Sequence, residues 1–186
     1  MAIRQKTTEP TRHRRGSTRQ SSCGIVRGMN RVAFDWDPRG SHAPGELRVL
    51  IDGRSLDELV RTVELPYATA EGHPQIAGAY RGIHPRQLHG SIREHLMGGP
   101  GSDLACGPAD KTVLLGCECG EIGCWPLMAR VEVRDGEIVW RDFQQPHRTG
   151  TWSYQDLDEF VFDRAQYETA IDQAEGALGR PPATTP

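Results

Sequence analysis

Residues 129–141 read ARVEVRDGEIVWR, and this stretch decides the fold class. Apolar residues alternate with charged ones on both sides of a central Asp-Gly dipeptide, which is typical of two-residue hairpin turns. Pairing across this turn places Val133 opposite Ile138 and Val131 opposite Trp140, so that one face of the ribbon is apolar. The sequence therefore predicts a β-hairpin over these residues, with its register set by the turn.

The segments that flank the hairpin on both sides predict further strands. Each is a run of about five residues that is rich in apolar and β-branched side chains and is followed by polar residues or glycine. The predicted strands are RVAFDW (31–36), ELRVLID (46–52), TVLLG (112–116) and FVF (160–162). With the hairpin, they form the predicted antiparallel sheet.

Two helices are predicted beside these strands. Ser55 and Glu58 have the spacing of a capping box, and the helix that they start is expected to end at Val63, before Pro66. Asp163 is placed to cap a second helix. The apolar residues of this second helix recur at helical spacing: Tyr167, Ala170, Ile171, Ala174 and Leu178. Helices flanking an antiparallel sheet make the predicted fold class α+β.

Charge divides the 186-residue chain into a basic leader and an acidic body. Residues 1–31 hold eight of the 22 Lys and Arg residues but only one of the 25 acidic residues, so the body carries 14 basic and 24 acidic residues. Residues 1–28 show no apolar periodicity and are predicted to be a disordered basic leader. Residues 29–178 are predicted to form a single domain, and residues 179–186 (GRPPATTP) a disordered tail. Met29 directly precedes the first predicted strand, so Met1 and Met29 are both candidate starts.

Several classes of protein are disfavoured by composition. No apolar run is long enough to cross a membrane, and the N-terminus has no apolar core of the secretory kind. An acidic body repels phosphate backbones, so nucleic-acid binding by the folded part is not expected. Five cysteines, an odd number, do not read as a disulfide framework. We therefore expect a cytoplasmic protein whose cysteines are free thiols, metal ligands or redox groups.

Three of the five cysteines lie on one connection between two predicted strands, within residues 116–125 (GCECGEIGCW). The glycines of this segment permit the tight turns that bring Cys117, Cys119 and Cys124 together. Thiolates that bind zinc must all lie about 2.3 Å from one point, and a closed tetrahedral site needs a fourth ligand. Cys106 and His147 are the candidates for that ligand, and a water in its place leaves an open, reactive site. Zn²⁺ is the candidate cofactor.

The same segment permits two other interpretations. Its spacing does not contain the paired C-x₂-C units of well-known zinc sites. Free cysteine is a small hydrophobe that is often buried in strands and tight turns, so the thiols can serve as packing alone. Redox or nucleophilic chemistry is the third interpretation. A papain-like site at Cys124-Trp125 is disfavoured, because a predicted strand follows where those proteases have a helix.

The stretch from Thr112 to Ala170 carries a longer pattern: VLLGCECGEIGCWPLMARVEV, then VWRDFQQPHR, then FVFDRAQYETA. It resembles a group of uncharacterised bacterial proteins with a strand–CxCGxxGCWPL–strand core. The resemblance implies that the cysteine turn, the hairpin around Trp140 and the last helix form one structural unit. It implies no activity.

Three functions are compatible with these features. The leading hypothesis is a non-enzymatic accessory or interaction protein whose cysteine turn binds zinc structurally. The second is an immunity- or antitoxin-like module with packed free thiols, in which the acidic body binds a basic protein partner. The third is a metal- or cysteine-dependent enzyme at the same segment. The sequence shows no evident acid–base pair, which favours the first two.

Overall fold

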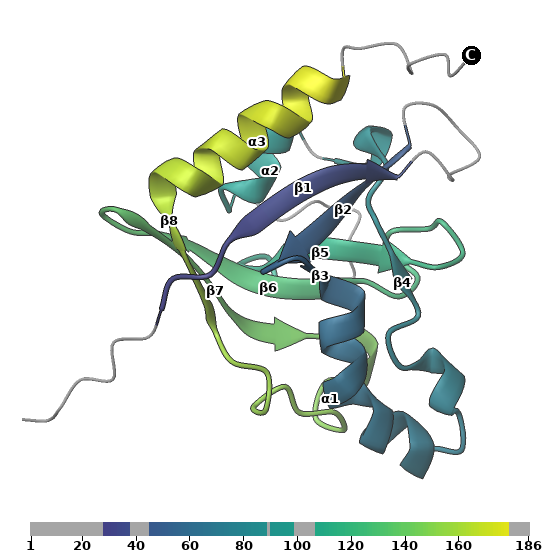
Figure 1. The fold of residues 1–186 in the computed structure, drawn as a ribbon. Helices are drawn as coiled ribbons and strands as arrows, with labels where there is room; N and C mark the ends of the chain where they lie inside the picture. The colour runs from purple at the N-terminus through teal and green to yellow at the C-terminus, as the bar shows by residue number, and fades with distance from the viewer. Residues whose placement is uncertain (1–27, 38–44, 89, 99–106, 179–186) are drawn as a thin grey trace, which may run out of the picture.

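The computed structural model describes residues 28–37, 45–88, 90–98 and 107–178. Within them the chain forms two antiparallel sheets and three α-helices, which confirms the α+β fold class (Figure 1). The predictions of a disordered leader and tail fall outside these residues apart from Gly28 and stay predictions. No helix in the described ranges combines the length and apolarity that a membrane span requires.

All the strands predicted from the sequence are present in the two sheets. The first sheet has the order β1-β2-β3, with β1 at Val32–Asp37, β2 at Glu46–Ile51 and β3 at Arg54–Ser55. The second sheet has the order β4-β5-β6-β7-β8, with β4 at Tyr80–Arg81, β5 at Thr112–Cys117, β6 at Leu127–Val133, β7 at Glu137–Gln144 and β8 at Phe160–Asp163. Every pairing in both sheets is antiparallel.

The β6–β7 hairpin has the register that its sequence predicts. Val133 pairs with Ile138 and Val131 pairs with Trp140. Gly136 at the turn has a φ of 77°, a left-handed conformation that favours glycine. Trp140 is completely buried, because the apolar face of the hairpin packs into the main core. The register slips once, between Met128 and Arg130, at the opposite end from the turn.

Two short backbone pairings join the sheets at both edges. Leu47 of β2 and Ile83, which follows β4, exchange N–H···O bonds of 2.9 and 3.1 Å. At the other edge, the N–H of Asn30 donates to the carbonyl of Val161 in β8 over 2.7 Å. The pairing therefore runs from β1 through β2, β4, β5, β6, β7 and β8 back to the segment before β1. The main core lies inside this ring of strands and under helix α3 (Arg164–Leu178), which lies beside β1.

Helix α1 spans Leu56–Ala70, so the expectation that it ends at Val63 is wrong. It continues through Pro66 because its buried stripe extends beyond the proline, to Ala68. This stripe recurs every four residues, at Leu56, Val60, Glu64 and Ala68. Its packing compensates for the backbone hydrogen bond that a proline inside a helix cannot make.

The start of α1 also differs from the predicted capping box. Ser55 occupies the N-cap position, but its side chain accepts no bond from the helix N–H groups. Its hydroxyl instead donates to the Asp57 carboxylate. In α3 the prediction is confirmed, because Oδ1 of Asp163 accepts a bond of 2.9 Å from the Gln166 N–H. The remaining helices are short: α2 at Ile92–Leu96, and 3₁₀ turns at Pro74–Ile76, Pro85–Gln87 and Pro146–Arg148.

Candidate metal centre

The three clustered cysteines lie where β5 ends and the chain turns back toward β6. Cys117 is the last residue of β5 and is half-buried, whereas Cys119 and Cys124 are exposed on the connection. Cys117 pairs with Tyr80 of β4, and the N–H of Glu118 donates to the carbonyl of Ala79 over 3.3 Å. One end of the cysteine turn, residues 117–124, is thus fixed to the sheet.

The cysteine turn is folded by two local hydrogen bonds. The N–H of Gly120 donates to the carbonyl of Cys117 over 2.9 Å, and the N–H of Cys124 donates to the carbonyl of Glu121 over 3.2 Å. Gly120 has a φ of 95°, so the tight turn that the sequence predicts depends on this glycine. Ile122 lies inside the second of these hydrogen-bonded turns and is buried with Ile83, Val113 and Met128, which anchors this part of the turn.

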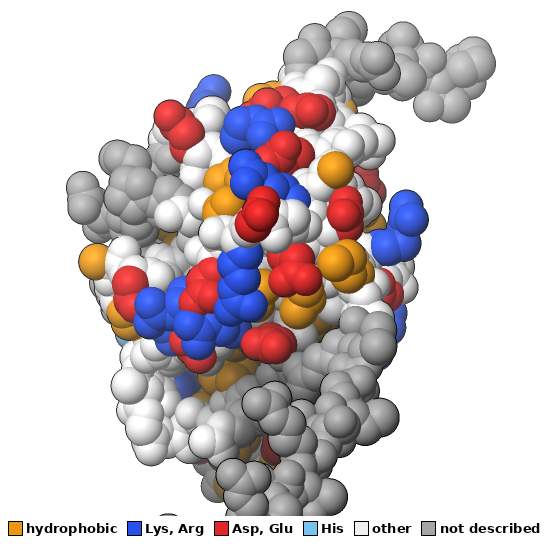
Figure 2. Space-filling view, turned by 90° about the vertical axis from the view of Figure 1, so that its left-hand side faces the viewer, with side chains coloured by type: hydrophobic (Ala, Val, Ile, Leu, Met, Phe, Trp, Pro, Cys, Tyr) orange, Lys and Arg blue, Asp and Glu red, His pale blue; other side chains and the backbone are white. Residues whose placement is uncertain are grey.

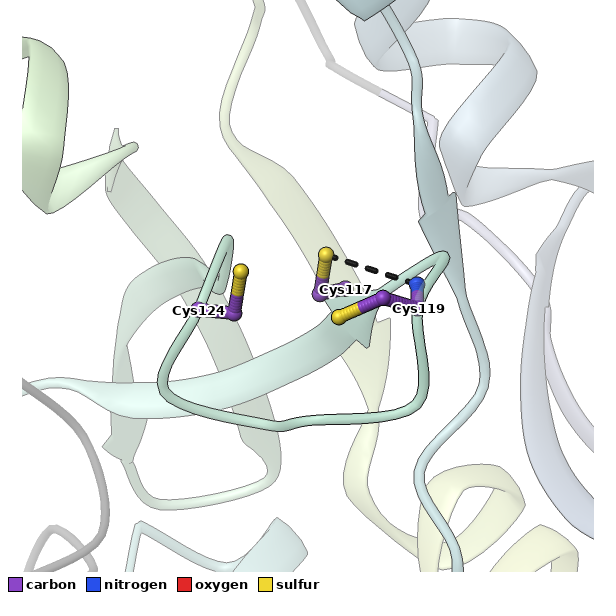
Figure 3. Close-up of side chains that lie close together, drawn as sticks. All are labelled: Cys117, Cys119 and Cys124. Carbon is purple, nitrogen blue, oxygen red and sulfur yellow. Dashed lines mark hydrogen bonds between the residues drawn. The ribbon is translucent and has the colours of Figure 1, made fainter.

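The turn brings the three sulfur atoms together. All three lie within 4.8 Å of one another, the one such group of candidate metal ligands that the described residues contain. Figure 3 shows the thiols of Cys117 and Cys119 side by side and that of Cys124 facing them across the turn. In a tetrahedral zinc site the sulfurs are about 3.8 Å apart, because each Zn–S bond is about 2.3 Å long. The observed spacing fits a metal after a small closure of the turn.

The thiols differ in their acidity. Burial raises the pKa of Cys117 to about 12. For Cys119, the backbone N–H of Glu121 is the main cause that lowers the pKa, and the Cys117 thiol adds to it. The N–H of Cys119 also donates to Sγ of Cys117 over 3.5 Å, which partly offsets the effect of burial. Because a metal binds thiolates, binding at this turn must release protons.

Of the two candidates for a fourth ligand, His147 and Cys106, only His147 lies among the described residues. His147 lies next to the turn, with its Nε2 3.1 Å from the carbonyl oxygen of Gly123 and its ring stacked on Trp125. It is not a member of the sulfur group. Cys106 lies outside the described residues, so its part in the site stays a prediction. The structure thus brings together the three predicted thiols and does not add His147 to them.

A hollow of about 430 Å³ opens beside the sulfurs. Its wall is largely apolar and comes from segments that are distant in sequence. The lining residues are Ile76, Ala79, Cys117, Glu118, Cys119, Cys124 and Trp125. Packing in the core does not account for Cys119 and Cys124, because both are exposed at this hollow.

A network of aromatic and charged side chains packs against Trp125, the residue that directly follows the cysteine turn. The guanidinium of Arg148 lies 4.8 Å from the ring centre of Trp125 and 5.7 Å from that of Trp152. Glu71 links Arg148 to Trp152, because its carboxylate accepts a hydrogen bond of 3.1 Å from the Arg148 guanidinium and one of 2.7 Å from the Trp152 indole. Sequence reasoning missed this network, because Glu71 and Arg148 are 77 positions apart and no local pattern relates them.

A second cluster that sequence reasoning missed lies under the same region. Glu64 of α1 is buried, and its carboxylate accepts hydrogen bonds from the hydroxyls of Tyr80 over 2.5 Å and of Tyr154 over 2.6 Å. The N–H of Gly78 donates a third bond of 2.8 Å. Burial raises the pKa of Glu64, although these three bonds act in the opposite direction. Tyr80 pairs with Cys117, so the cluster adjoins the cysteine turn.

The cysteine turn has to be interpreted from its own residues. The resemblance of residues 112–170 to a bacterial group stays a prediction, because no homologous sequence tests it. The chain matches no protein-family model, no curated protein and no solved structure.

Proposed function

We propose that this protein is a non-enzymatic accessory or interaction protein that binds a zinc ion through Cys117, Cys119 and Cys124. The observation that carries the proposal is the convergence of three sulfurs within 4.8 Å on a connection with two exposed thiols. Thiolates are soft ligands and favour zinc over the harder Mg²⁺ and Ca²⁺. Three protein ligands on zinc leave one coordination position open.

The metal orders the turn rather than the whole fold. All three ligands lie within eight consecutive residues, so a metal closes one short loop and joins no distant segments. The sheets are already joined by two backbone pairings, one between Leu47 and Ile83 and one between Asn30 and β8. A site that contributes so little to the fold is better suited to presenting a surface or binding an external group. This supports an interaction role over a purely structural zinc.

The metal content of the purified protein tests this proposal. The full chain, purified under reducing conditions without chelator, is expected to carry about one zinc ion per chain by elemental mass spectrometry. The triple variant Cys117→Ser, Cys119→Ser, Cys124→Ser should carry none. Cys23→Ser, which removes a thiol far away in sequence, serves as the matched control and should keep the full zinc content.

A reactivity measurement separates zinc binding from free thiols. With zinc bound, the three cysteines should react slowly with a thiol reagent until a chelator is added. A metal content near zero, with three thiols that react at once or with a disulfide among them, would contradict the proposal.

A further inference from the structure

The hollow beside the sulfurs gives an external ligand access to the fourth coordination position of the metal site. It measures about 430 Å³ and is lined by the three cysteines together with Ile76, Ala79, Glu118 and Trp125. This volume is within the range of sites for small organic molecules, roughly 300–1,000 Å³. A ligand that enters it can therefore reach the open coordination position while its carbon atoms contact the apolar wall.

No described side chain of the protein fills that position. The group of ligand atoms within 4.8 Å of one another contains only the three cysteines among the described residues. His147 is adjacent, but its Nε2 lies 3.1 Å from the Gly123 carbonyl and its ring is stacked on Trp125 at an interplanar angle of 20°. The fourth ligand must then come from a residue outside the described ranges, such as Cys106, or from outside the chain.

Charged side chains near the hollow are already paired with one another. Arg81 forms an ion pair with Glu46, and Arg148 forms one with Glu71 over 3.1 Å. Glu118 is the charged residue among those that line the hollow, and most of the remaining wall is apolar. These features favour a ligand with an apolar body that reaches the metal through a single donor atom.

We propose that the fourth position of the metal is taken by a thiolate from outside the chain, whose carbon body packs on Ile76 and Trp125. The proposal rests on zinc binding at the cysteine turn. A metal that already has three thiolate ligands favours another soft ligand, and a thiolate meets that requirement. The incoming thiol gives its proton to solvent, its sulfur binds the metal, and the bound water leaves. The thiol can belong to a small molecule or to a cysteine of a partner protein.

Cobalt replaces zinc and makes the thiolate ligands visible in absorption. The full chain loaded with Co²⁺ is titrated with benzyl mercaptan, which is apolar, and with 2-mercaptoethanol, which is polar. The sulfur-to-cobalt absorption should rise by about one third as three thiolates become four. Benzyl mercaptan should bind about tenfold more tightly than 2-mercaptoethanol, because its phenyl group packs on the apolar wall.

Two variants test whether the carbon body of the thiol packs on the apolar wall. Two are used so that the test still holds if one of the substitutions perturbs the fold. Trp125→Ala and Ile76→Ser should each bring the affinity for benzyl mercaptan close to that for 2-mercaptoethanol, with the cobalt spectrum before thiol addition unchanged. Circular dichroism shows whether each variant is folded. Equal affinity of the unaltered protein for both thiols, or a preference that survives both substitutions in folded protein, overturns the role of the wall.

Cys106→Ser tests the internal alternative. If the fourth ligand is external, this variant keeps the full cobalt absorption and the full response to thiol. A loss of about one quarter of the absorption in Cys106→Ser, or no response of the unaltered protein to either thiol, overturns the proposal. Failure to bind cobalt or zinc at all is a different result, because it contradicts the metal site itself.

The source of the thiol is distinguished with a peptide. A short peptide with one cysteine between two leucines is compared with benzyl mercaptan on the same cobalt-loaded chain. Binding of the peptide more than about tenfold tighter, or about 1.4 kcal/mol, supports a cysteine of a partner protein. Weaker binding of the peptide supports a small organic thiol.

Discussion

Glu64 is a residue whose acidity the tertiary structure changes, because the fold buries its carboxylate. Its carboxylate is buried on α1, where it accepts hydrogen bonds from the hydroxyls of Tyr80 and Tyr154 and from the N–H of Gly78 rather than pairing with a cation of the described residues. Burial raises the pKa of Glu64 above its ordinary value of 4.5. At pH values between 4.5 and the raised pKa, Glu64 is therefore protonated more often in the folded protein than in the unfolded chain. The free energy of unfolding must fall as the pH rises through this interval.

Replacing this carboxyl with an amide should remove that pH dependence. The free energy of unfolding of the unaltered protein is expected to fall relative to that of Glu64→Gln as the pH rises from 4.5 through the raised pKa of Glu64. The loss is about 1.4 kcal/mol for each pH unit between the two pKa values. Denaturant unfolding at a series of pH values measures it. Glu58→Gln, an exposed change on the same helix, is the matched control, and its free energy of unfolding should depend on pH as that of the unaltered protein does. If the curve for Glu64→Gln also runs parallel to that of the unaltered protein, the expectation is contradicted.

At the scale of the elements, α1 shows how packing overrides a local signal. A proline inside a helix lacks the N–H that would bond to the carbonyl four residues earlier. The sequence therefore predicts that the helix ends before Pro66. The helix nevertheless reaches Ala70, because Glu64 and Ala68 on its buried face are held against the body of the protein. The packing of this buried face therefore offsets the loss in the free energy of unfolding that the proline causes.

Removal of this proline should stabilise the protein. Pro66→Ala restores a backbone donor inside an existing helix at an exposed position, and the free energy of unfolding is expected to rise by about 1–3 kcal/mol. Thermal and denaturant unfolding measure the change. Leu65→Ala, at the exposed neighbouring position, is the control and should change stability by less than about 0.5 kcal/mol. A lower stability of Pro66→Ala would show that α1 needs the irregularity at Pro66.

At the scale of the whole molecule, the ring of strands depends on the close approach of two backbones. Gly82 lies beside β2, where Leu47 pairs with Ile83. A Cβ at position 82 would lie 2.5 Å from the carbonyl oxygen of Leu47 and 2.8 Å from its carbon. These are backbone atoms held by the pairing between the sheets, so they cannot move aside as the end of a side chain can. Glycine is required here by space.

A single methyl group at this position should therefore weaken the ring. Gly82→Ala is expected to lower the free energy of unfolding by about 1–3 kcal/mol, as measured by denaturant unfolding. Gly28→Ala is the control, because a Cβ there would meet no atom within 4 Å. Equal stability of the two variants would mean that the pairing of Leu47 with Ile83 does not hold the sheets together.

On one face of the molecule, charged side chains lie in small mixed groups rather than in blocks. On the face shown in Figure 2, basic and acidic side chains are interleaved over the described residues. On β6 and β7, Arg130 contacts Asp110 and Asp142, and Arg141 contacts Glu132. These arginines are thus paired with neighbouring acids, and the described residues on the face in Figure 2 offer no large region of a single sign to a charged partner.

The sequence by itself determined the parts of this protein that depend on neighbouring residues. The alternation around the Asp-Gly turn sets the register of the β6–β7 hairpin, and Asp163 caps α3 through a bond three residues along the chain. The proximity of Cys117, Cys119 and Cys124 is likewise local, because one turn with Gly120 in a left-handed conformation brings the sulfurs together.

Only the tertiary structure decided the features that join distant segments. The closure of the ring at Leu47 and Ile83, the length of α1 and the burial of Glu64 depend on contacts across 14 to 90 positions. The exposure of Cys119 and Cys124 at an apolar hollow was decided in the same way, because its wall comes from Ile76 and Ala79. Local spacing shows which groups can meet, whereas long-range packing decides whether they face the core or the solvent.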